Sequence, residues 1–321
     1  MRQIPAAVAV IGLTALALVG CAPSGPADSG CERVTAPASS LDLVDVSGAQ
    51  GAPTAKTTDP VYVTKTSYTD LATGKGTPIT TDKQDVQLGI TLLNGATGQT
   101  VLSAPSRLIQ LSVLEQTFPT IAKALDCTRP GARVVSAIPA RDLEPSLVSQ
   151  IGLTEGQAAV LVVDVNTVFL PAANGVPQYV DGSNIPTVVL APDGTPGVIV
   201  PDAAPPKDLV VKTLKKGDGE KITADSTPRL HYTGVLWKTG EVFDSTWEKG
   251  TPVTLSMTNV VKGFADALEG QTVGSQVLVV IPPSLGYGDK ESGSIPADST
   301  LVFVIDVLGI DTSEDAQSAT Q

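Results

Sequence analysis

The sequence is poor in the residues that build most catalytic and metal sites. Histidine occurs once, at His231, and the three cysteines are Cys21, Cys31 and Cys127. One histidine and scattered cysteines without close spacing make a poor zinc ligand set. A histidine without a partner on its own strand is more often a packed residue than a catalytic base. We therefore expect neither a metal centre nor Ser-His-Asp hydrolysis, and we predict no cofactor.

Positive charge and aromatic residues are also scarce. Lys and Arg total 21 against 33 Asp and Glu, which gives a net charge of −12. This charge repels polyphosphates, so nucleic acid is not an expected partner. Aromatics make up 4% of the chain, while Val, Ile, Thr and Gly are abundant, a composition that favours strands and turns over long helices. The length of 321 residues allows about two domains.

Only one long apolar run is present, at the N-terminus. Arg2 precedes an uncharged run from Ile4 to Val19, and Leu18-Val19-Gly20-Cys21 ends it. This pattern resembles the lipobox of bacterial lipoproteins. The resemblance implies transfer of a diacylglyceryl group, with fatty acids such as palmitate, to the Cys21 sulfur, cleavage before Cys21, and anchoring to the outer face of the cytoplasmic membrane. The alternatives are an ordinary secretory signal or a single transmembrane helix, although the run is shorter than the about 20 residues that span a bilayer.

An exported protein rarely leaves two thiols free, so Cys31 and Cys127 are a possible disulfide, although their separation says nothing about proximity.

Composition divides the rest of the chain into segments. Inside a Pro- and Gly-rich stretch, Thr187–Leu190 and Gly197–Val200 predict a short hairpin. The expected segments are a signal peptide (1–20), a lipidated flexible stalk (21–55), a first domain (56–170), a linker with that hairpin (171–206), a second domain (207–311) and a polar, frayed tail (312–321).

The two predicted domains resemble each other. Residues 74–80 match residues 217–223 after 143 positions, and Val163-Asp164-Val165 falls on Ile305-Asp306-Val307 after 142. A nearly constant register indicates two copies of one fold. In the second copy we expect strands over 208–215, 228–236, 276–281 and 300–308, and a helix over 260–268 that Thr258 or Asn259 caps and Gly270 ends. The predicted class is α+β, a twisted antiparallel sheet with one short helix.

The second copy is similar to the FKBP-type peptidyl-prolyl cis-trans isomerases. The motifs that carry this resemblance include His231–Gly234, Phe243–Ser245, Val260–Phe264, Gly286–Gly288 and Thr300–Phe303, in the family's order. They extend over residues 208–310. The resemblance implies two FKBP-like domains, each a twisted antiparallel β-sheet wrapped around one short α-helix. It places the prolyl pocket on Tyr232, Phe243, Asp244, Val260, Val261, Phe264, Tyr287, Ile295 and Phe303, and catalysis on Asp244, Tyr287 and Phe243.

This resemblance predicts a peptidyl-prolyl isomerase that assists the folding of exported proteins through a desolvating aromatic pocket. Its expected partners are proline-containing segments of exported polypeptides, the membrane through the lipid on Cys21, and macrolide inhibitors of the FKBP class. His231 is then structural. Two departures from the family, Phe264 in place of a tryptophan and Val253 in place of an aromatic residue, leave an alternative open. This alternative is a non-catalytic peptide-binding or chaperone lipoprotein.

The first copy lacks the residues of this site. In the same register, Leu88-Gly89-Ile90 takes the His-Tyr-Thr positions, Val101-Leu102 the Phe-Asp positions, and Ile121-Ala122 lies near Gly-Phe. A copy without the pocket aromatics and the aspartate should fold without isomerising proline. We interpret it as a degenerate FKBP-like domain that acts as a spacer, a partner surface or a peptide-holding chaperone module.

Overall fold

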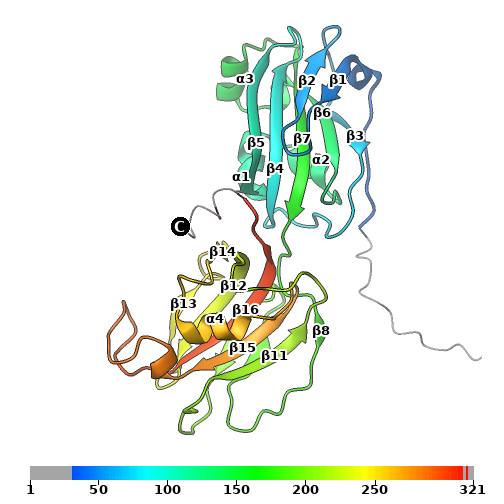
Figure 1. Cartoon of the computed structure of the whole chain (residues 1–321). Helices are drawn as coiled ribbons and strands as arrows, with labels where there is room; N and C mark the ends of the chain where they lie inside the picture. The colour runs from blue at the N-terminus through cyan, green and yellow to red at the C-terminus, as the bar shows by residue number, and fades with distance from the viewer. Residues whose placement is uncertain (1–30, 314–315, 317–321) are drawn as a thin grey trace, which may run out of the picture. The chain divides into compact units, whose positions relative to one another are not determined.

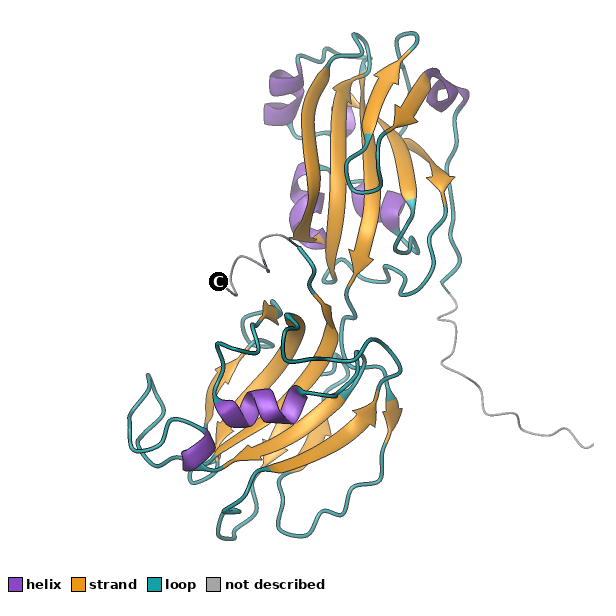
Figure 2. Ribbon diagram, viewed as in Figure 1, coloured by secondary structure: helices purple, strands orange, loops and turns teal. Residues whose placement is uncertain are grey.

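The described part of the chain contains antiparallel sheets and few helices (Figures 1 and 2). The computed structural model describes residues 31–313 and residue 316. The predicted signal peptide, Cys21 and most of the predicted tail lie outside these residues. Within the described ranges, no helix is both long and apolar enough to cross a membrane.

The first repeat (31–170) is built on a five-stranded sheet in the order β3-β6-β7-β4-β5. The strands are β3 (Ser67–Ala72), β4 (Asp85–Asn94), β5 (Thr100–Gln110), β6 (Arg133–Pro139) and β7 (Ala158–Val168). Three helices accompany them: α1 (Leu111–Thr117), α2 (Ile121–Leu125) and α3 (Pro145–Ile151). The expectation of one helix per copy was therefore wrong here. Leu111, Ile121 and Ile151 bury their side chains in the core on one face of the sheet, and this burial holds the helices there.

The second repeat (171–313) has a seven-stranded sheet in the order β13-β12-β16-β15-β11-β8, with β14 also paired to β12. Its strands are β8 (Val176–Pro177), β11 (Val210–Lys216), β12 (Pro228–Leu236), β13 (Val242–Ser245), β14 (Val253–Thr254), β15 (Gln276–Ile281) and β16 (Leu301–Ile310). One helix, α4 (Lys262–Leu268), lies across this sheet (Figure 2). Short 3₁₀ turns occur at Ser39–Leu43, Ala140–Asp142 and Pro283–Leu285.

A hairpin covers the other face of each sheet. In the first repeat β1 (Val44–Ser47) and β2 (Thr54–Thr57) place Val44 and Ala55 against Val135 and Val160 of the sheet. In the second repeat β9 (Thr187–Leu190) and β10 (Pro196–Ile199) place Val188 and Val198 against Val280 and Val302. Each repeat is therefore a sheet between a helical layer and a hairpin.

These hairpins correct two of the predicted segments. Residues 39–55 of the predicted flexible stalk form a 3₁₀ turn, β1 and the start of β2. The predicted linker 171–206 contributes β8 to the second sheet, and Ala203 O accepts a hydrogen bond from Trp237 Nε1 at 3.1 Å. Both segments contain Pro and Gly, but Val44 in the first and Val188 and Val198 in the second bury one side of each hairpin.

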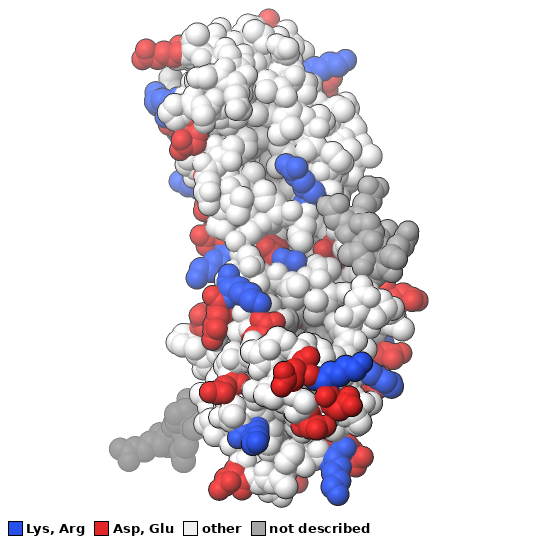
Figure 3. Space-filling model, turned by 90° about the vertical axis from the view of Figure 1, so that its left-hand side faces the viewer, with Lys and Arg blue, Asp and Glu red and all other residues white. Residues whose placement is uncertain are grey.

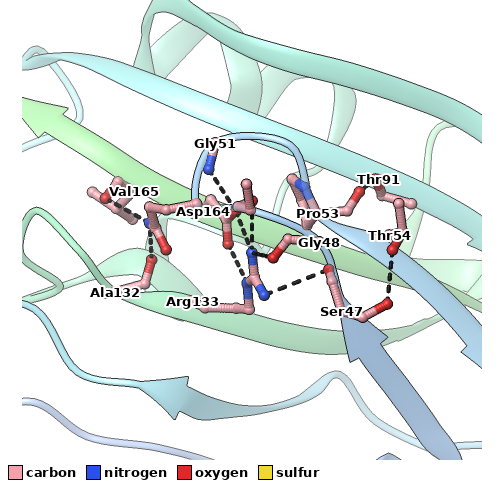
Figure 4. Close-up of polar contacts among 12 residues, drawn as sticks. Ser47, Gly48, Gly51, Pro53, Thr54, Thr91, Ala132, Arg133, Asp164 and Val165 are labelled. Atoms are coloured by element: carbon pink, nitrogen blue, oxygen red, sulfur yellow. Dashed lines mark hydrogen bonds and ion pairs between the residues drawn. The ribbon is translucent and has the colours of Figure 1, made fainter.

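A buried aspartate fastens each sheet to the segment before it. In the first repeat Asp164 accepts hydrogen bonds from Arg133 Nε at 2.6 Å and from the Gly51 amide, in the β1–β2 turn, at 2.8 Å (Figure 4). In the second repeat Asp306 accepts from Gln276 Nε2 at 2.7 Å and from the Ala173 amide at 2.8 Å. Burial raises the pKa of Asp306. Asp164 and Asp306 therefore make the same kinds of hydrogen bond at equivalent positions of the two repeats.

The N-terminal end of the described chain is fixed to the first sheet. Cys31 and Cys127 form a disulfide. Arg33 pairs with Asp70 of β3 at 2.6 Å, and the Ala36 amide donates to Tyr68 O. The disulfide and these contacts are further reasons why residues 31–55 are not a free stalk.

Two local expectations differ from the structure. Gly89 pairs with Asp164 and His231 pairs with Asp306, so Gly89-Ile90-Thr91, not Leu88-Gly89-Ile90, takes the His-Tyr-Thr positions. Pairing with the last strand fixes this register because a one-residue slip would move every side chain to the other face. Helix α4 begins at Lys262 with Val261 as its N-cap and no side-chain cap bond, so the predicted capping by Thr258 or Asn259 was wrong.

Candidate functional site

Aromatic rings cluster on the helical side of the second sheet around Phe303 of β16. The Phe303 ring makes edge contacts with Phe264 of α4 at 5.2 Å, Phe243 of β13 at 5.4 Å and Tyr232 of β12 at 5.9 Å. Such edge-to-face contacts are favourable because the positive ring edge meets a negative face. Three strands and one helix thus supply one aromatic wall.

Gly234 and aliphatic neighbours shape this wall. A Cβ atom on Gly234 would lie 2.5 Å from Phe243 Cζ and 3.0 Å from Phe303 Cε1, so only glycine leaves room for both rings. Ile295 and Phe264 are buried in the same cluster, and Val260 and Val261 pack against it half-buried. The structure therefore brings together seven of the nine residues that the resemblance assigns to the pocket: Tyr232, Phe243, Val260, Val261, Phe264, Ile295 and Phe303.

Asp244 forms the polar edge of the cluster. Its Oδ2 accepts a hydrogen bond from Tyr232 OH at 2.5 Å, and its Oδ1 pairs with Lys249 Nζ at 2.5 Å. Burial raises the pKa of Asp244, but the hydrogen bonds from Lys249 and Tyr232 outweigh burial and hold that pKa below its usual range. Burial, and next the Asp244 carboxylate, raise the pKa of Tyr232. Near neutral pH the pair is a carboxylate and a neutral phenol.

Tyr287 lies on the loop between the Pro283–Leu285 turn and β16. This residue is 41% exposed, so it faces solvent and not the core. The proximity of Tyr287 is a minor cause of the raised pKa of Tyr232, so Tyr287 lies near the polar edge of the cluster. A separate cleft of about 620 Å³ lies between residues 201–205 and 296–300, and none of the nine site residues lines it.

Sequence reasoning missed Lys249 and the packing role of Met257. Lys249 stands five residues after Asp244 in an irregular turn, where no periodicity relates the two side chains. Met257 is buried against the aromatic cluster from a segment without regular structure. Val253, half-buried in β14, takes the position where the family often has an aromatic residue.

His231 lies next to the site but has a structural environment. Its Nδ1 is 2.9 Å from Thr246 Oγ1, and its ring stacks on Trp247 with centroids 4.1 Å apart. Thr246 Oγ1 also accepts from the Tyr232 amide at 2.8 Å. Burial, and secondarily the Arg229 charge, lower the pKa of His231 to about 4. His231 thus links the strand of Tyr232 to the strand of Asp244 as a neutral ring.

The lowered pKa predicts a loss of stability in mild acid. The pKa of His231 in the folded chain lies below its value of about 6.5 in the unfolded chain. The neutral His231 ring therefore contributes its full stabilisation above pH 6.5 and loses it as the pH falls toward 4. Between pH 7.5 and 5 the free energy of unfolding should fall by about 2 kcal/mol from His231 alone.

Urea unfolding at both pH values, with His231→Asn beside the unaltered chain, measures this contribution. His231 is the chain's one histidine, so no other imidazole titrates in that window. Equal pH dependence in the two proteins would contradict the prediction.

The first repeat has aliphatic residues at the corresponding positions. With Asp164 at the position of Asp306, Ile90 takes the place of Tyr232 and Leu161 that of Phe303. Both are buried in the first core. This repeat keeps the sheet but not the aromatic wall or its acid.

Comparisons with known proteins point to one family. The family model described as FKBP-type peptidyl-prolyl cis-trans isomerase matches residues 218–308. An FK506-binding protein of Streptomyces anulatus is 38% identical over 36% of this chain and 96% of its own length. A probable FK506-binding protein of Corynebacterium glutamicum is 33% identical over 35% of this chain and 96% of its own length. The crystal structure of FkpA from Escherichia coli shares 28% identity, covers 39% of this chain and 51% of that one, and has a TM-score of 0.31.

Proposed function

The chain belongs to the FKBP-type peptidyl-prolyl cis-trans isomerase family, and on this premise we propose that its second repeat isomerises X–Pro bonds in exported polypeptides. The observation that carries this proposal is the aromatic cluster around Phe303 with the Tyr232–Asp244–Lys249 edge. Proline-containing peptides and macrolides are ligands of the family in general, and the same wall is the proposed site for both here.

The reaction requires no nucleophile. Conjugation gives an imide bond a rotational barrier of about 18–20 kcal/mol. The planar state is more polar than the twisted state, so removing water from the imide carbonyl favours the twisted one. A dry wall made by Phe243, Phe264 and Phe303 would hold the proline ring and exclude water. The isomerisation would then be accelerated without any covalent step.

Polar groups at the edge would orient the substrate. Tyr287 is an exposed residue, and its hydroxyl would donate to a carbonyl of the bound peptide. Asp244, held by Tyr232 and Lys249, presents a fixed negative charge beside the twisting bond. Preorganised groups of this kind act without reorganising during the reaction.

We place this activity outside the cytoplasm, on a chain anchored through Cys21. The lipobox-like sequence before Cys21 supports the anchor. The Cys31–Cys127 disulfide supports an oxidising compartment, because such bonds are rare in the cytosol. In cells fed an alkyne analogue of palmitate, the chain should become labelled, and Cys21→Ala should abolish the label. An unlabelled chain would sink the anchor proposal.

The test of the activity uses a chymotrypsin-coupled cis-to-trans assay on a short X–Pro peptide. The full chain should accelerate isomerisation in proportion to its concentration. The competing function is a non-catalytic peptide-binding or chaperone lipoprotein, which the departures at Phe264 and Val253 favour. A folded chain that suppresses aggregation of an unfolded protein but leaves the isomerisation rate unchanged would establish that competitor.

A further inference from the structure

The turn that follows the acid of the site brings Lys249 back to Asp244. Within this turn, residues 245–250, two main-chain amides donate to Ser245 at 3.4 Å. These distances are longer than the about 2.7–3.2 Å of ordinary N–H···O hydrogen bonds, so the two bonds are weak. Packing of side chains is then needed to fix the conformation of the turn.

The ion pair that the turn carries is exposed to solvent. The Lys249 side chain is 63% exposed, yet its Nζ lies 2.5 Å from Asp244 Oδ1. Acidic and basic side chains lie close together over the second repeat in Figure 3, so a freely moving lysine has several carboxylates to choose from. Exposed ion pairs are weak because holding a long side chain in one conformation costs entropy. The pair therefore depends on a turn that keeps Lys249 near Asp244.

The Trp247 ring anchors this turn. It stacks on His231 of β12 with ring centroids 4.1 Å apart and planes inclined by 20°. The same ring lies against Gly194 in the β9–β10 turn, where a Cβ atom on Gly194 would be 3.2 Å from Trp247 Cη2. Trp247 is half-buried, and its Nε1 is buried without a hydrogen-bond partner among the described residues. Ring packing, and not a hydrogen bond, thus holds Trp247 in place.

The hairpin that contacts Trp247 lies outside the segment shared with the family. The family model matches residues 218–308, whereas β9 and β10 lie within residues 187–199. Gly194 has a φ of +95°, and a Cβ atom there would also lie 3.1 Å from Ala172 Cβ. A positive φ and so narrow a space both favour glycine. The turn of the hairpin is therefore shaped to lie close to the Trp247 ring.

We propose that Trp247 is a positioning residue of the isomerase site and that the β9–β10 hairpin acts on the reaction through it. Gly194 and His231 hold the ring, the ring holds residues 245–250, and these residues keep Lys249 on Asp244. The effect on isomerisation rests on the proposed function. The hairpin is then part of the isomerase unit and not only a cover for the sheet.

A double-mutant cycle, measured as kcat/KM for a short X–Pro peptide, tests the route of this effect. Lys249→Gln and Trp247→Ala should each lower kcat/KM about fivefold, as the loss of an exposed charge pair beside the reacting bond predicts. The double variant should be no slower than Lys249→Gln alone, because Trp247 then has no lysine to position. An additive loss of about 25-fold would overturn the inference, since the ring would act independently of Lys249.

Conservative and matched variants separate positioning from loss of fold. Trp247→Phe keeps an aromatic ring on His231 and gives up no hydrogen bond, so its kcat/KM should stay within about twofold of the unaltered chain's. Gly194→Val pushes a side chain against the ring and should act like Trp247→Ala. Gly197→Ala, in the same hairpin, should have no effect because its Cβ would meet only Val189 O, at 3.5 Å. Equal effects of the two glycine variants would overturn the role of the hairpin.

The pKa of the Asp244 carboxyl reads the same positioning without an activity assay. Burial raises this pKa, and the hydrogen bonds from Lys249 and Tyr232 lower it. Trp247→Ala should therefore raise it as Lys249→Gln does, and carbon-13 NMR of chains labelled at the aspartate side chains measures it, with the signal assigned by its loss in Asp244→Asn. A protonated His231 would lower this pKa, so the loss of the stacked ring cannot imitate the expected result through His231.

The two measurements keep this inference separate from the proposed function. A chain that does not isomerise the peptide, but in which Trp247→Ala raises the pKa of Asp244, would refute the proposed function and leave Trp247 as the residue that positions Lys249. A chain that isomerises the peptide, but in which Trp247→Ala leaves that pKa unchanged, would overturn the inference and leave the proposed function standing.

Discussion

Replacing Asp244 by alanine should lower kcat/KM for an X–Pro peptide ten- to a hundredfold. The Asp244 carboxylate accepts a hydrogen bond from Tyr232 OH and forms an ion pair with Lys249 Nζ. Its removal takes away the fixed negative charge and leaves Tyr232 and Lys249 without this partner. Hydrogen bonds to charged groups contribute about 1.5–3 kcal/mol each. A loss of that size in the transition state corresponds to about a ten- to hundredfold lower rate.

Asp266→Ala is the matched control. Asp266 pairs with Lys262 at 2.7 Å on the exposed face of α4 in the same repeat, so this variant also separates an aspartate from a lysine. Its activity should stay within twofold of the unaltered chain. Equal activities of the two variants, with equal far-UV spectra, would remove Asp244 from the reaction.

The sequence predicts central strands well because they are buried on both faces. The expected strands 228–236 and 276–281 coincide with β12 and β15, and in β15 β-branched residues form a nearly continuous apolar run. The aromatic cluster was also predictable, because each ring lies within a motif of its own. Phe303, for example, follows Thr300-Leu301-Val302 in the last strand.

The polar edge of the site was less predictable. Lys249 could not be distinguished by pattern from Lys238 or Lys262, which are other lysines on nearby segments. The conformation of the turn after Asp244 decides whether the Lys249 side chain can reach the carboxylate. The spacing of the two residues in the sequence does not determine that conformation. The register at Gly89 failed for a related reason, because pairing with Asp164 sets it and local sequence similarity does not.

The packing of the second repeat's hairpin on the sheet was not predictable from its sequence. The hairpin itself was expected and is present as β9 and β10, but such short strands carry too few residues to show that one side is buried. The burial depends on Val280 and Val302, which lie about 100 residues later in the chain. A substitution in β10 can test directly whether residues 171–206 are a free linker or pack on the sheet.

Replacing Val198 by aspartate should lower the free energy of unfolding of the second repeat by about 2–4 kcal/mol. Val198 packs with Val280, Val302 and Trp237 on the face opposite the helix, where a carboxylate would have to be desolvated or the hairpin would have to detach. Trp237 and Trp247, the chain's two tryptophans, both lie in this repeat. Urea unfolding followed by their fluorescence therefore reports on it.

Ile199→Asp provides the control from the neighbouring position. Ile199 is 62% exposed because successive side chains of a strand point to opposite faces, so an aspartate there should cost less than about 0.5 kcal/mol. A large difference between the two variants requires β10 to lie on the sheet in solution. Two small and equal effects would return residues 171–206 to the role of a free linker, and the isomerase unit would then begin near residue 207 and not near 171.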